Sequence, residues 1–290
     1  MNEDRKGILL AGGTGTRLYP LTATMSKQLV AVYNKPMIYY SLSTMMLAGV
    51  REILLISTPR DLSAYQDLLG SGDRFGIEFS YAEQSEPRGI AEAFIIGERF
   101  LGSQSSMLVL GDNLFYGRMD FLRTASADTG DDAIIFGYEV ADPSSYGVVH
   151  FDETWRATKL EEKPENASSR WAVPGLYFYP PGVTDEARQL DPSGRGELEI
   201  TDLNTRYLKA GRLKVVPMGR GIAWFDTGTP TALLEAANFI EAIEKRQGLI
   251  IGSPEEISLA QGFVSSQQFL KHVRLLPASD YRTYLERLVP

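Results

Sequence analysis

Short apolar runs and amphipathic stretches alternate through the first half of the chain. Residues 7–11 are apolar and lie between a charged segment and a glycine-rich one, which is typical of a strand buried on both faces of a parallel sheet. Similar patterns predict strands at 51–58, 77–83 and 107–110, with helices at 36–49, 61–69 and 89–100 between them. Repeated strand–helix–strand units predict an α/β fold, Rossmann-like, in which helices flank a mostly parallel mixed sheet.

The second half of the chain is richer in strands. The pattern predicts strands at 133–140, 146–151, 156–162, 171–179 and 213–218, and helices at 182–190 and 199–210. Thr229 and Pro230 form an N-cap and first-turn pair for a long helix at 230–246, whose apolar positions are Leu233, Leu234, Ala237, Ile240 and Ile243. Shorter helices are expected at 254–260, 265–275 and 279–288. We therefore expect one α/β domain over residues 1–228 and a helical C-terminal extension over residues 229–290.

The composition limits the classes of function. The chain has 290 residues and a net charge of −8, which disfavours broad binding to nucleic acid or to an anionic membrane. It contains no cysteine and two histidines, so thiolate chemistry is excluded and a histidine triad or zinc site is disfavoured. Because the sequence has no run of about 18 apolar residues, a cytoplasmic protein is the default expectation.

A glycine-rich segment follows the first predicted strand and precedes two basic residues, Arg17 and Lys27. Free backbone N–H groups and fixed positive charges at the carboxyl end of a strand suit a nucleoside triphosphate. The segment is not a P-loop, because no lysine follows its glycines, and Leu18 stands where a dinucleotide fingerprint requires its third glycine. An ordinary glycine-rich turn is the alternative interpretation.

Two separated carboxylates are candidates for metal binding. Asp112 follows a buried strand, where an open α/β sheet places its ligands, and Asp226 follows an aromatic strand. Carboxylates with no histidine nearby suit Mg²⁺, which prefers a few protein oxygens together with substrate phosphates and water. Asp226 could instead cap the following turn, Glu161 to Lys163 could be a solvated charge run, and Arg195 could simply lie in a turn.

Several short motifs are distinctive in combination. They are GGTGTRL, SKQL, NKPMIYY, LVLGDNLFYG, YGVVHFD, LEEKP, AVPGLYFY, RGELEITDLN and WFDTGT. Together they resemble the sugar-nucleotide pyrophosphorylases, a family of nucleotidyltransferases, and within it the branch that transfers thymidylyl groups to glucose 1-phosphate. The resemblance extends from Lys6 to about Pro254, and it implies a nucleotide half over about 1–112 and a sugar-phosphate half over about 113–228.

The resemblance also implies roles for the matching residues. Arg17, Lys27 and Asp112 would be catalytic, and Asp112 and Asp226 would hold Mg²⁺. Gln28 and Gln84 would read the pyrimidine edge. The nucleotide would be bound by Leu10, Gly12, Gly13, Gly15, Thr16, Arg17, Gln28, Gln84, Gly89 and Asp112. The sugar phosphate would be bound by Tyr146, Gly147, Glu162, Lys163, Val173 and Arg195.

The implied reaction is a Mg²⁺-dependent condensation of dTTP with α-D-glucose 1-phosphate, which yields dTDP-glucose and pyrophosphate without a covalent enzyme intermediate. It would be the first step toward dTDP-rhamnose and other deoxysugars. The resemblance further implies a homotetramer with feedback inhibition by a dTDP-sugar. The C-terminal helices could form that subunit interface or pack on their own subunit.

Some residues depart from the pattern of this branch. Asn34 stands where aspartate is usual, Ala31 and Ser41 where proline is common, and Arg88 where aspartate often precedes the glycine. Arg88 would adjoin the base pocket, so dTTP is expected first and UTP as a weaker substrate. The alternatives are a transferase that prefers UTP or CTP and a non-catalytic sensor of sugar nucleotides. A nicotinamide-dependent dehydrogenase is disfavoured by the broken fingerprint.

Overall fold

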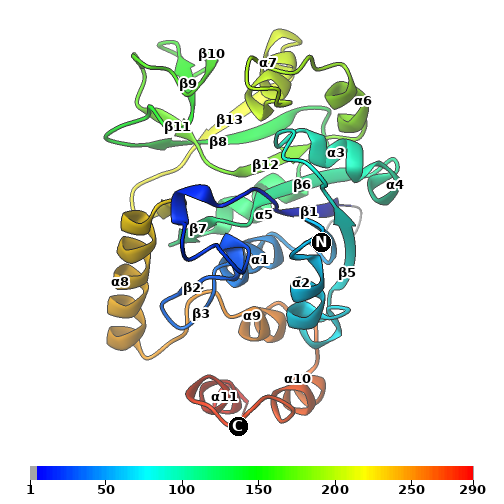
Figure 1. Cartoon of the computed structure of the whole chain (residues 1–290), viewed down its shortest axis with the longest axis vertical. Helices are drawn as coiled ribbons and strands as arrows, with labels where there is room; N and C mark the ends of the chain where they lie inside the picture. Colours follow the sequence, from blue (N-terminus) through cyan, green and yellow to red (C-terminus); the bar gives the residue numbers. More distant parts are fainter. Residues whose placement is uncertain (1–4, 290) are drawn as a thin grey trace.

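A ten-stranded mixed sheet crosses the middle of the molecule (Figure 1). The computed structural model describes residues 5–289; residues 1–4 and 290, at the ends of the expected domains, lie outside the described part. Along the sheet the strands follow the order β10 (Ala157–Glu162), β9 (Gly147–Phe151), β11 (Trp171–Val173), β8 (Ala133–Glu139), β12 (Leu176–Tyr179), β6 (Ser105–Leu110), β1 (Arg5–Ala11), β4 (Glu52–Ser57) and β5 (Glu78–Glu83). β13 (Leu213–Pro217) pairs with β8 off this path.

The sheet has a parallel half and an antiparallel half. β6, β1, β4 and β5 run parallel to one another, and β13 runs parallel to β8. β12 pairs antiparallel with β6 and β8, and β9, β10 and β11 continue the antiparallel part. The α/β sheet that the sequence predicts is confirmed, and its antiparallel strands lie in the strand-rich second half.

The central strand β1 explains why its sequence is apolar throughout. Leu9 packs into one hydrophobic cluster, while Ile8 and Leu10 on the opposite face pack into another. Successive side chains of a strand point to opposite faces, so a strand covered on both sides must be apolar at every position.

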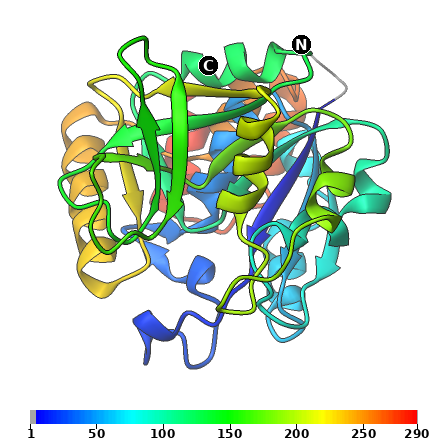
Figure 2. The same cartoon turned by 90° about the horizontal axis from the view of Figure 1, so that it is seen from above.

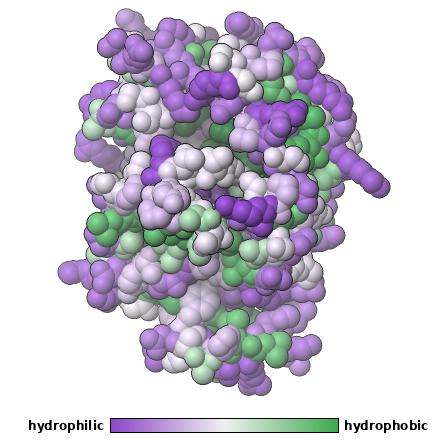
Figure 3. All heavy atoms as spheres, in the orientation of Figure 1, coloured by the Kyte–Doolittle hydropathy of each residue, from purple (hydrophilic) through white to green (hydrophobic). Residues whose placement is uncertain are grey.

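Helices cover both faces of the sheet (Figure 1). The first cluster includes residues of α1 (Ile38–Leu47), α2 (Leu62–Leu69), α5 (Asp120–Ala127) and α9 (Pro254–Ala260). The second includes residues of α3 (Glu92–Ile96), α4 (Glu98–Leu101), α6 (Val183–Arg188) and α7 (Ile200–Lys209). On the face of the molecule shown in Figure 3, hydrophilic residues surround smaller groups of hydrophobic ones. Within residues 5–289, no helix is both long and apolar enough to cross a lipid bilayer.

Two predicted elements are interrupted at glycine or proline. The helix expected at 89–100 divides into α3 and α4 at Gly97, where a side chain would press on the backbone of the preceding turn and on strand residues. The strand expected at 171–179 divides into β11 and β12 at Pro174 and Gly175, because proline cannot donate a ladder hydrogen bond. In both places the sequence predicted the type and the approximate range of the element, but not its interruption.

Several short elements have no counterpart in the sequence prediction. They are the hairpin β2 (Ala31–Val32) and β3 (Lys35–Pro36), the strand β7 (Asn113–Tyr116) and helix α5. β7 pairs antiparallel with β14 (Ala223–Asp226), the aromatic strand before the second candidate carboxylate, and this pairing sets Asp226 opposite Asn113. Strands of two to four residues are too short to show a period of their own.

The C-terminal helices pack on the α/β body. α8 (Pro230–Gln247) begins as predicted, with the Thr229 hydroxyl accepting a hydrogen bond from the Ala232 amide at 3.2 Å, and it flanks one side of the sheet in Figure 2. The assignment of Leu234 to its buried face is wrong, since this side chain is 61% exposed. α10 (Ser266–Val273) and α11 (Asp280–Glu286) share a small cluster of their own, with Val264, Phe269, Val273 and Leu285 at its centre.

A buried ion pair joins the β2–β3 hairpin to α8. The Lys35 ammonium lies 3.0 Å from a Glu244 carboxylate oxygen, and both residues are less than a tenth exposed. Glu244 also accepts hydrogen bonds from the Asn34 amide at 2.7 Å and the Ile251 backbone N–H at 2.8 Å. Burial lowers the pKa of Lys35 even though Glu244 opposes the shift. Asn34, a departure from the family pattern, therefore takes part in this buried network.

Glu244→Ala should lower the free energy of unfolding by about 3–5 kcal/mol, because the buried Lys35 ammonium would lose its partner. Urea unfolding followed by circular dichroism measures this. Glu241→Ala, on the same helix but in an exposed pair with Lys245, is the matched control and should change stability by less than about 1 kcal/mol. Equal losses from the two variants would contradict the role assigned to the buried pair.

Candidate active site

The candidate site lies where β1 and β6 end. The two strands are parallel neighbours with Leu10 opposite Leu110, so the glycine-rich loop after β1 and Asp112 after β6 emerge side by side. A cavity of about 210 Å³ opens there. Its lining comes from five parts of the chain and consists of Leu10, Gly12, Gly13, Lys27, Gln28, Gln84, Pro87, Gly89, Ile90, Leu110, Asp112 and Glu197. Seven of the ten residues predicted to bind the nucleotide are in this lining.

The glycine-rich loop takes a backbone path that most residues avoid. Gly13 and Gly15 have φ angles of 94° and 60°, in the left-handed region. The Gly15 carbonyl accepts a hydrogen bond from the Thr22 hydroxyl at 2.8 Å, which closes the loop on itself. A single 3₁₀ turn, Thr16–Leu18, follows in place of the long helix that a dinucleotide-binding loop would open. Figure 2 shows this loop, in dark blue, projecting beyond the sheet.

Two basic residues face the two candidate carboxylates. The Lys27 ammonium is hydrogen-bonded to Asp112. Arg17 lies beside Asp226, because a Cβ at Gly228 would meet both the Arg17 guanidinium at 2.6 Å and the Asp226 carboxylate at 3.1 Å. Gly228 therefore leaves the space in which this arginine approaches the acid. The structure thus brings together four side chains that are up to 209 positions apart in the sequence, from Arg17 to Asp226.

The two carboxylates differ in their proton affinity. Burial, and after it the negative charge of Asp112, raise the pKa of Asp226 to about 6 against the opposing effect of Lys27 and Arg17. Burial also acts to raise the pKa of Asp112, but the Lys27 charge and hydrogen bonds from Lys27 and Asn113 hold it below the ordinary value. The positive charges nearby therefore stabilise the ionised form of Asp112, whereas they do not fully offset the cost of ionising Asp226.

Asp112 is held by residues that the sequence analysis did not assign to the site. The Asn113 amide donates to the Asp112 carboxylate at 3.1 Å, and its own oxygen accepts from Gly175 N–H at 2.9 Å and Trp224 Nε1 at 2.7 Å. The Thr227 hydroxyl donates to the Asp112 carbonyl at 2.8 Å. Asn113 adjoins Asp112 in the sequence, but Gly175, Trp224 and Thr227 come from segments more than 60 positions away, so no local sequence signal links them to this carboxylate.

Ser41, another departure from the family pattern, also supports this segment. Its fully buried hydroxyl lies 3.1 Å from the Leu110 carbonyl and 2.9 Å from the Asn113 carbonyl, on either side of Asp112. No role in the site was predicted for Ser41 from the sequence. Its contacts make it a support for the backbone that carries the carboxylate.

The residues expected around the base are already engaged with the protein. The Gln28 amide donates to the Gly12 carbonyl at 3.2 Å, its oxygen accepts from the Ser26 hydroxyl at 2.5 Å, and its side chain is 2% exposed. Gln84 donates to the Gly89 carbonyl at 3.3 Å and to Glu92 at 2.8 Å. Both glutamines line the cavity while shaping the loops around it, and their reading of a base stays a prediction.

The structure explains why a glycine occupies position 89 and shows where the side chain of Arg88 lies. A side chain at Gly89, with a φ angle of 101°, would meet the Leu198 backbone nitrogen at 2.6 Å, so glycine is needed for this close approach. The Arg88 side chain is exposed and paired with Glu86 at 2.9 Å. Arg88 is therefore on the surface beside the pocket and absent from its lining.

The predicted sugar-phosphate residues gather at the start of β9 and the end of β10. A Cβ at Gly147 would lie 3.6 Å from a Glu162 oxygen and 3.9 Å from Val173, which places these three residues around one space. Lys163 and Arg195 lie 3.3 and 3.2 Å from the other Glu162 oxygen. The Tyr146 ring packs 5.0 Å from that of Trp224, on the strand leading to Asp226.

Two more polar residues belong to this group and were not predicted. The Thr201 hydroxyl donates to Glu162 at 2.6 Å, and Glu199 accepts from Arg195 at 2.8 Å. Both lie in the RGELEITD motif, at the start of α7. That motif was used to recognise the family, and the roles of its acidic and hydroxyl residues become visible when α7 packs against β10.

The donor set at the carboxylate pair suits magnesium better than a softer metal. Asp112 and Asp226 would supply oxygen ligands, and no group of three or more histidine, aspartate or glutamate side chains with metal-site geometry occurs within residues 5–289. Zn²⁺ sites in proteins usually have three or four protein ligands, whereas Mg²⁺ commonly uses one or two carboxylates and completes its shell with phosphate oxygens and water. The residues present therefore fit a magnesium ion that arrives with a phosphate.

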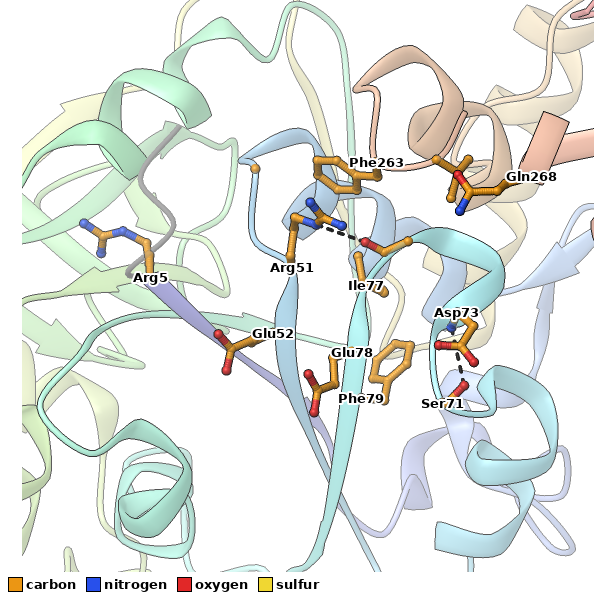
Figure 4. A pocket seen from close by; sticks show the side chains of 13 residues that line it. Arg5, Arg51, Glu52, Ser71, Asp73, Ile77, Glu78, Phe79, Phe263 and Gln268 are labelled. Carbon is orange, nitrogen blue, oxygen red and sulfur yellow. Dashed lines mark hydrogen bonds between the residues drawn. The ribbon is translucent and has the colours of Figure 1, made fainter. Parts of the chain in front are cut away.

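A larger cavity of about 870 Å³ lies at the opposite ends of the parallel strands (Figure 4). Arg51 at its edge donates to the Gly76 carbonyl at 3.0 Å and lies over the Phe263 ring at 5.1 Å, while Glu52 and Glu78 supply acidic side chains. None of the predicted site residues lines it. In an open α/β sheet, ligands bind outside the carboxyl ends of the strands, so the smaller cavity is the better candidate.

Comparisons with known proteins identify the family of the chain. The sequence model of the nucleotidyl transferase family matches residues 6–243. A glucose-1-phosphate thymidylyltransferase of Xanthomonas campestris pv. campestris is 52% identical over 286 residues, which cover 98% of this chain and 97% of that protein.

Solved structures place the fold in the same group. One from Bacillus anthracis, of a protein assigned as a glucose-1-phosphate thymidylyltransferase and solved with sucrose, is 36% identical with a TM-score of 0.76 and covers 81% of this chain and 94% of that one. A UDP-glucose pyrophosphorylase solved with UDP-glucose is 25% identical with a TM-score of 0.74 and covers 84% of this chain and 99% of that one. This chain belongs to the nucleotidyl transferase family, and within it to the glucose-1-phosphate thymidylyltransferases.

Proposed function

We propose that this protein condenses dTTP with α-D-glucose 1-phosphate to form dTDP-glucose and pyrophosphate. The observation that carries the proposal is that Lys27 and Asp112, which line the cavity at the ends of β1 and β6, are brought together with Arg17 and Asp226. A sensor of sugar nucleotides would need positive charge only for the diphosphate of its ligand, whereas a transferase that joins two polyanions must also offset their repulsion at the reacting phosphorus.

The reaction exchanges one phosphorus–oxygen bond for another. A phosphate oxygen of glucose 1-phosphate attacks the α-phosphorus of dTTP, and the bond from that phosphorus to the oxygen bridging to the β-phosphate breaks. Pyrophosphate leaves with the electron pair on the side opposite the attack. No protein nucleophile is required, which agrees with a chain that contains no cysteine.

Each charged residue has a place in this scheme. Arg17 binds the triphosphate beside the glycine-rich loop, and Lys27 offsets negative charge at the reacting phosphorus. Lys163 and Arg195 hold the sugar phosphate, while Glu162 accepts hydrogen bonds from sugar hydroxyls. Asp112 and Asp226 would hold Mg²⁺, which when bound supplies positive charge to the phosphate oxygens.

The finer points of the proposal concern selectivity, assembly and pathway. We propose dTTP over UTP, although the fold is shared with a UDP-glucose pyrophosphorylase. A homotetramer, feedback inhibition by a dTDP-sugar and a place at the start of dTDP-deoxysugar synthesis, in the cytoplasm, are further parts of the proposal. The apolar faces of α10 and α11 pack on each other within the subunit, so an interface there would use their outer faces.

Lys27→Ala should lower the turnover number by roughly 10²–10³-fold, because a positive charge preorganised at the reacting centre would be lost. A coupled pyrophosphate-release assay at saturating dTTP and glucose 1-phosphate measures the change. Lys271→Ala, which removes an exposed lysine on α10, is the control and should leave turnover unchanged. Near-normal turnover in Lys27→Ala would remove this residue from the mechanism.

The proposed substrates are tested by a matrix of dTTP, UTP, CTP, ATP and GTP against several hexose 1-phosphates, with Mg²⁺ or with EDTA. We expect the highest kcat/KM for dTTP with glucose 1-phosphate, weaker activity with UTP, and none with EDTA. A preference for UTP at equal concentration would overturn the nucleotide assignment, and undiminished activity in EDTA would overturn the metal assignment.

A further inference from the structure

A second hollow lies at the far end of the hairpin that carries the proposed sugar-phosphate residues. It has a volume of about 520 Å³. Gly147 and Glu162 lie at one end of β9 and β10, and this hollow surrounds the other end, where the two strands are joined. The five residues of β9 separate the two places by roughly 15 Å along the strand. It is lined by Glu139, His150, Phe151, Asp152, Glu153, Trp155, Ser168, Ser169, Arg170 and Trp171.

Three aromatic rings form a corner in this hollow. The Trp155 and Trp171 rings are 5.5 Å apart at an angle of 85°, and the Trp171 and Phe151 rings are 5.9 Å apart at 88°. Phe151 and Trp171 are partly buried over Gly137 of β8, where a Cβ would come within 3.3 Å of the Trp171 ring. Trp155 stands on the outside and is 57% exposed.

The backbone at Trp155 is unusual for so large a residue. Its φ angle is 62°, a left-handed conformation that costs free energy for any residue with a Cβ and that glycine adopts freely. Asp152 holds the turn by accepting hydrogen bonds from Thr154 N–H at 2.8 Å and Arg156 N–H at 3.0 Å. A strained residue whose indole is mostly in solvent contributes little to the core, which suggests that the indole has a binding role.

The charges around the corner limit its ligand. Glu139, Asp152 and Glu153 supply three carboxylates, and Arg170, the one arginine or lysine of the lining, is already 3.5 Å from Glu139. His150 is paired with Glu161 at 2.6 Å and has the Ser168 hydroxyl 3.5 Å from its other ring nitrogen. An anionic ligand would be repelled by this lining, whereas hydroxyl groups could donate to its carboxylates.

We propose that this aromatic corner, made by Phe151, Trp155 and Trp171, is a second binding site for a neutral pyranose ring, separate from the catalytic pocket. A pyranose has an apolar C–H face that can pack on an indole and hydroxyl groups around its edge. This matches a site with exposed aromatic surface and an acidic, hydroxyl-bearing rim. The ligand is a neutral hexose, either free or as a residue of an oligosaccharide.

The test uses full-length protein labelled with 5-fluorotryptophan and observed by ¹⁹F NMR. The chain has three tryptophans, and Trp224 packs against Tyr146 in the catalytic region, so its resonance reports on that region. Methyl α-D-glucopyranoside and maltotriose are the probes, and glucuronate is the anionic comparison. We expect saturable shifts of the Trp155 and Trp171 resonances with the neutral sugars, an unshifted Trp224 resonance, and weaker binding of glucuronate.

Substitutions of Trp155 show whether its side chain binds a sugar or only shields the hydrophobic core from solvent. Trp155→Gly suits the left-handed backbone, so it should fold with an unchanged or higher Tm and weaken sugar binding, read from the Trp171 resonance, by roughly tenfold or more. Trp155→Tyr should keep part of the affinity, and Leu275→Ala, at an exposed residue of the C-terminal region, should keep all of it.

Several results would overturn the proposal. They are no shift with either neutral sugar, a shift confined to Trp224, equal affinity in Trp155→Gly, tighter binding of glucuronate, or a large fall in the Tm of Trp155→Gly. The condensation assay on Trp155→Gly keeps the two sites apart, because its kcat and KM should equal those of the unaltered protein. Loss of the proposed pyranose site would leave the proposed reaction untouched.

Discussion

The closeness of two carboxylates, the buried Asp112 and the partly buried Asp226, is the constraint on which the site depends. Burial and mutual repulsion both disfavour the second negative charge, and the pKa of Asp226, about 6, records that cost. Lys27 and Arg17 compensate part of the charge, and Asn113, Thr227 and the β7–β14 pair keep the acids from moving apart. A cation and a triphosphate would supply the positive and negative groups that complete this arrangement.

The elements that could be predicted are those whose signal is local. The apolar run of β1 shows that this strand is buried on both faces. The pair Thr229 and Pro230 marks the N-cap and the first residue of α8. β7 could not be predicted, because its four residues become a strand only by pairing with β14, more than 100 positions later. Leu234 fits the helical period, yet it faces solvent because no other element of the described chain covers it. The sequence of α8 alone does not show which of its apolar residues another element will cover.

For the candidate site, the charged residues could be predicted from the sequence and the residues that support them could not. Its charged residues were identified from motifs, and the structure brings them together. Their supports were not identified: Asn113 accepts from Trp224, and Ser41 reaches two carbonyls, through contacts that exist only after the sheet forms. The same holds for the aromatic corner, where Trp155 and Trp171 come from different segments and meet because β9 pairs with both β10 and β11.

The free energy of unfolding of Asp226→Asn, compared with the unaltered protein by urea titration without Mg²⁺, tests the central constraint most directly. A carboxyl whose pKa is raised from 3.8 to about 6 by folding lowers stability progressively as the pH rises through that window. The variant should therefore be more stable by about 1–3 kcal/mol at a pH near 7.5 and nearly equal near pH 4, while losing activity. A variant that is less stable than the unaltered protein near pH 7.5 would contradict this account.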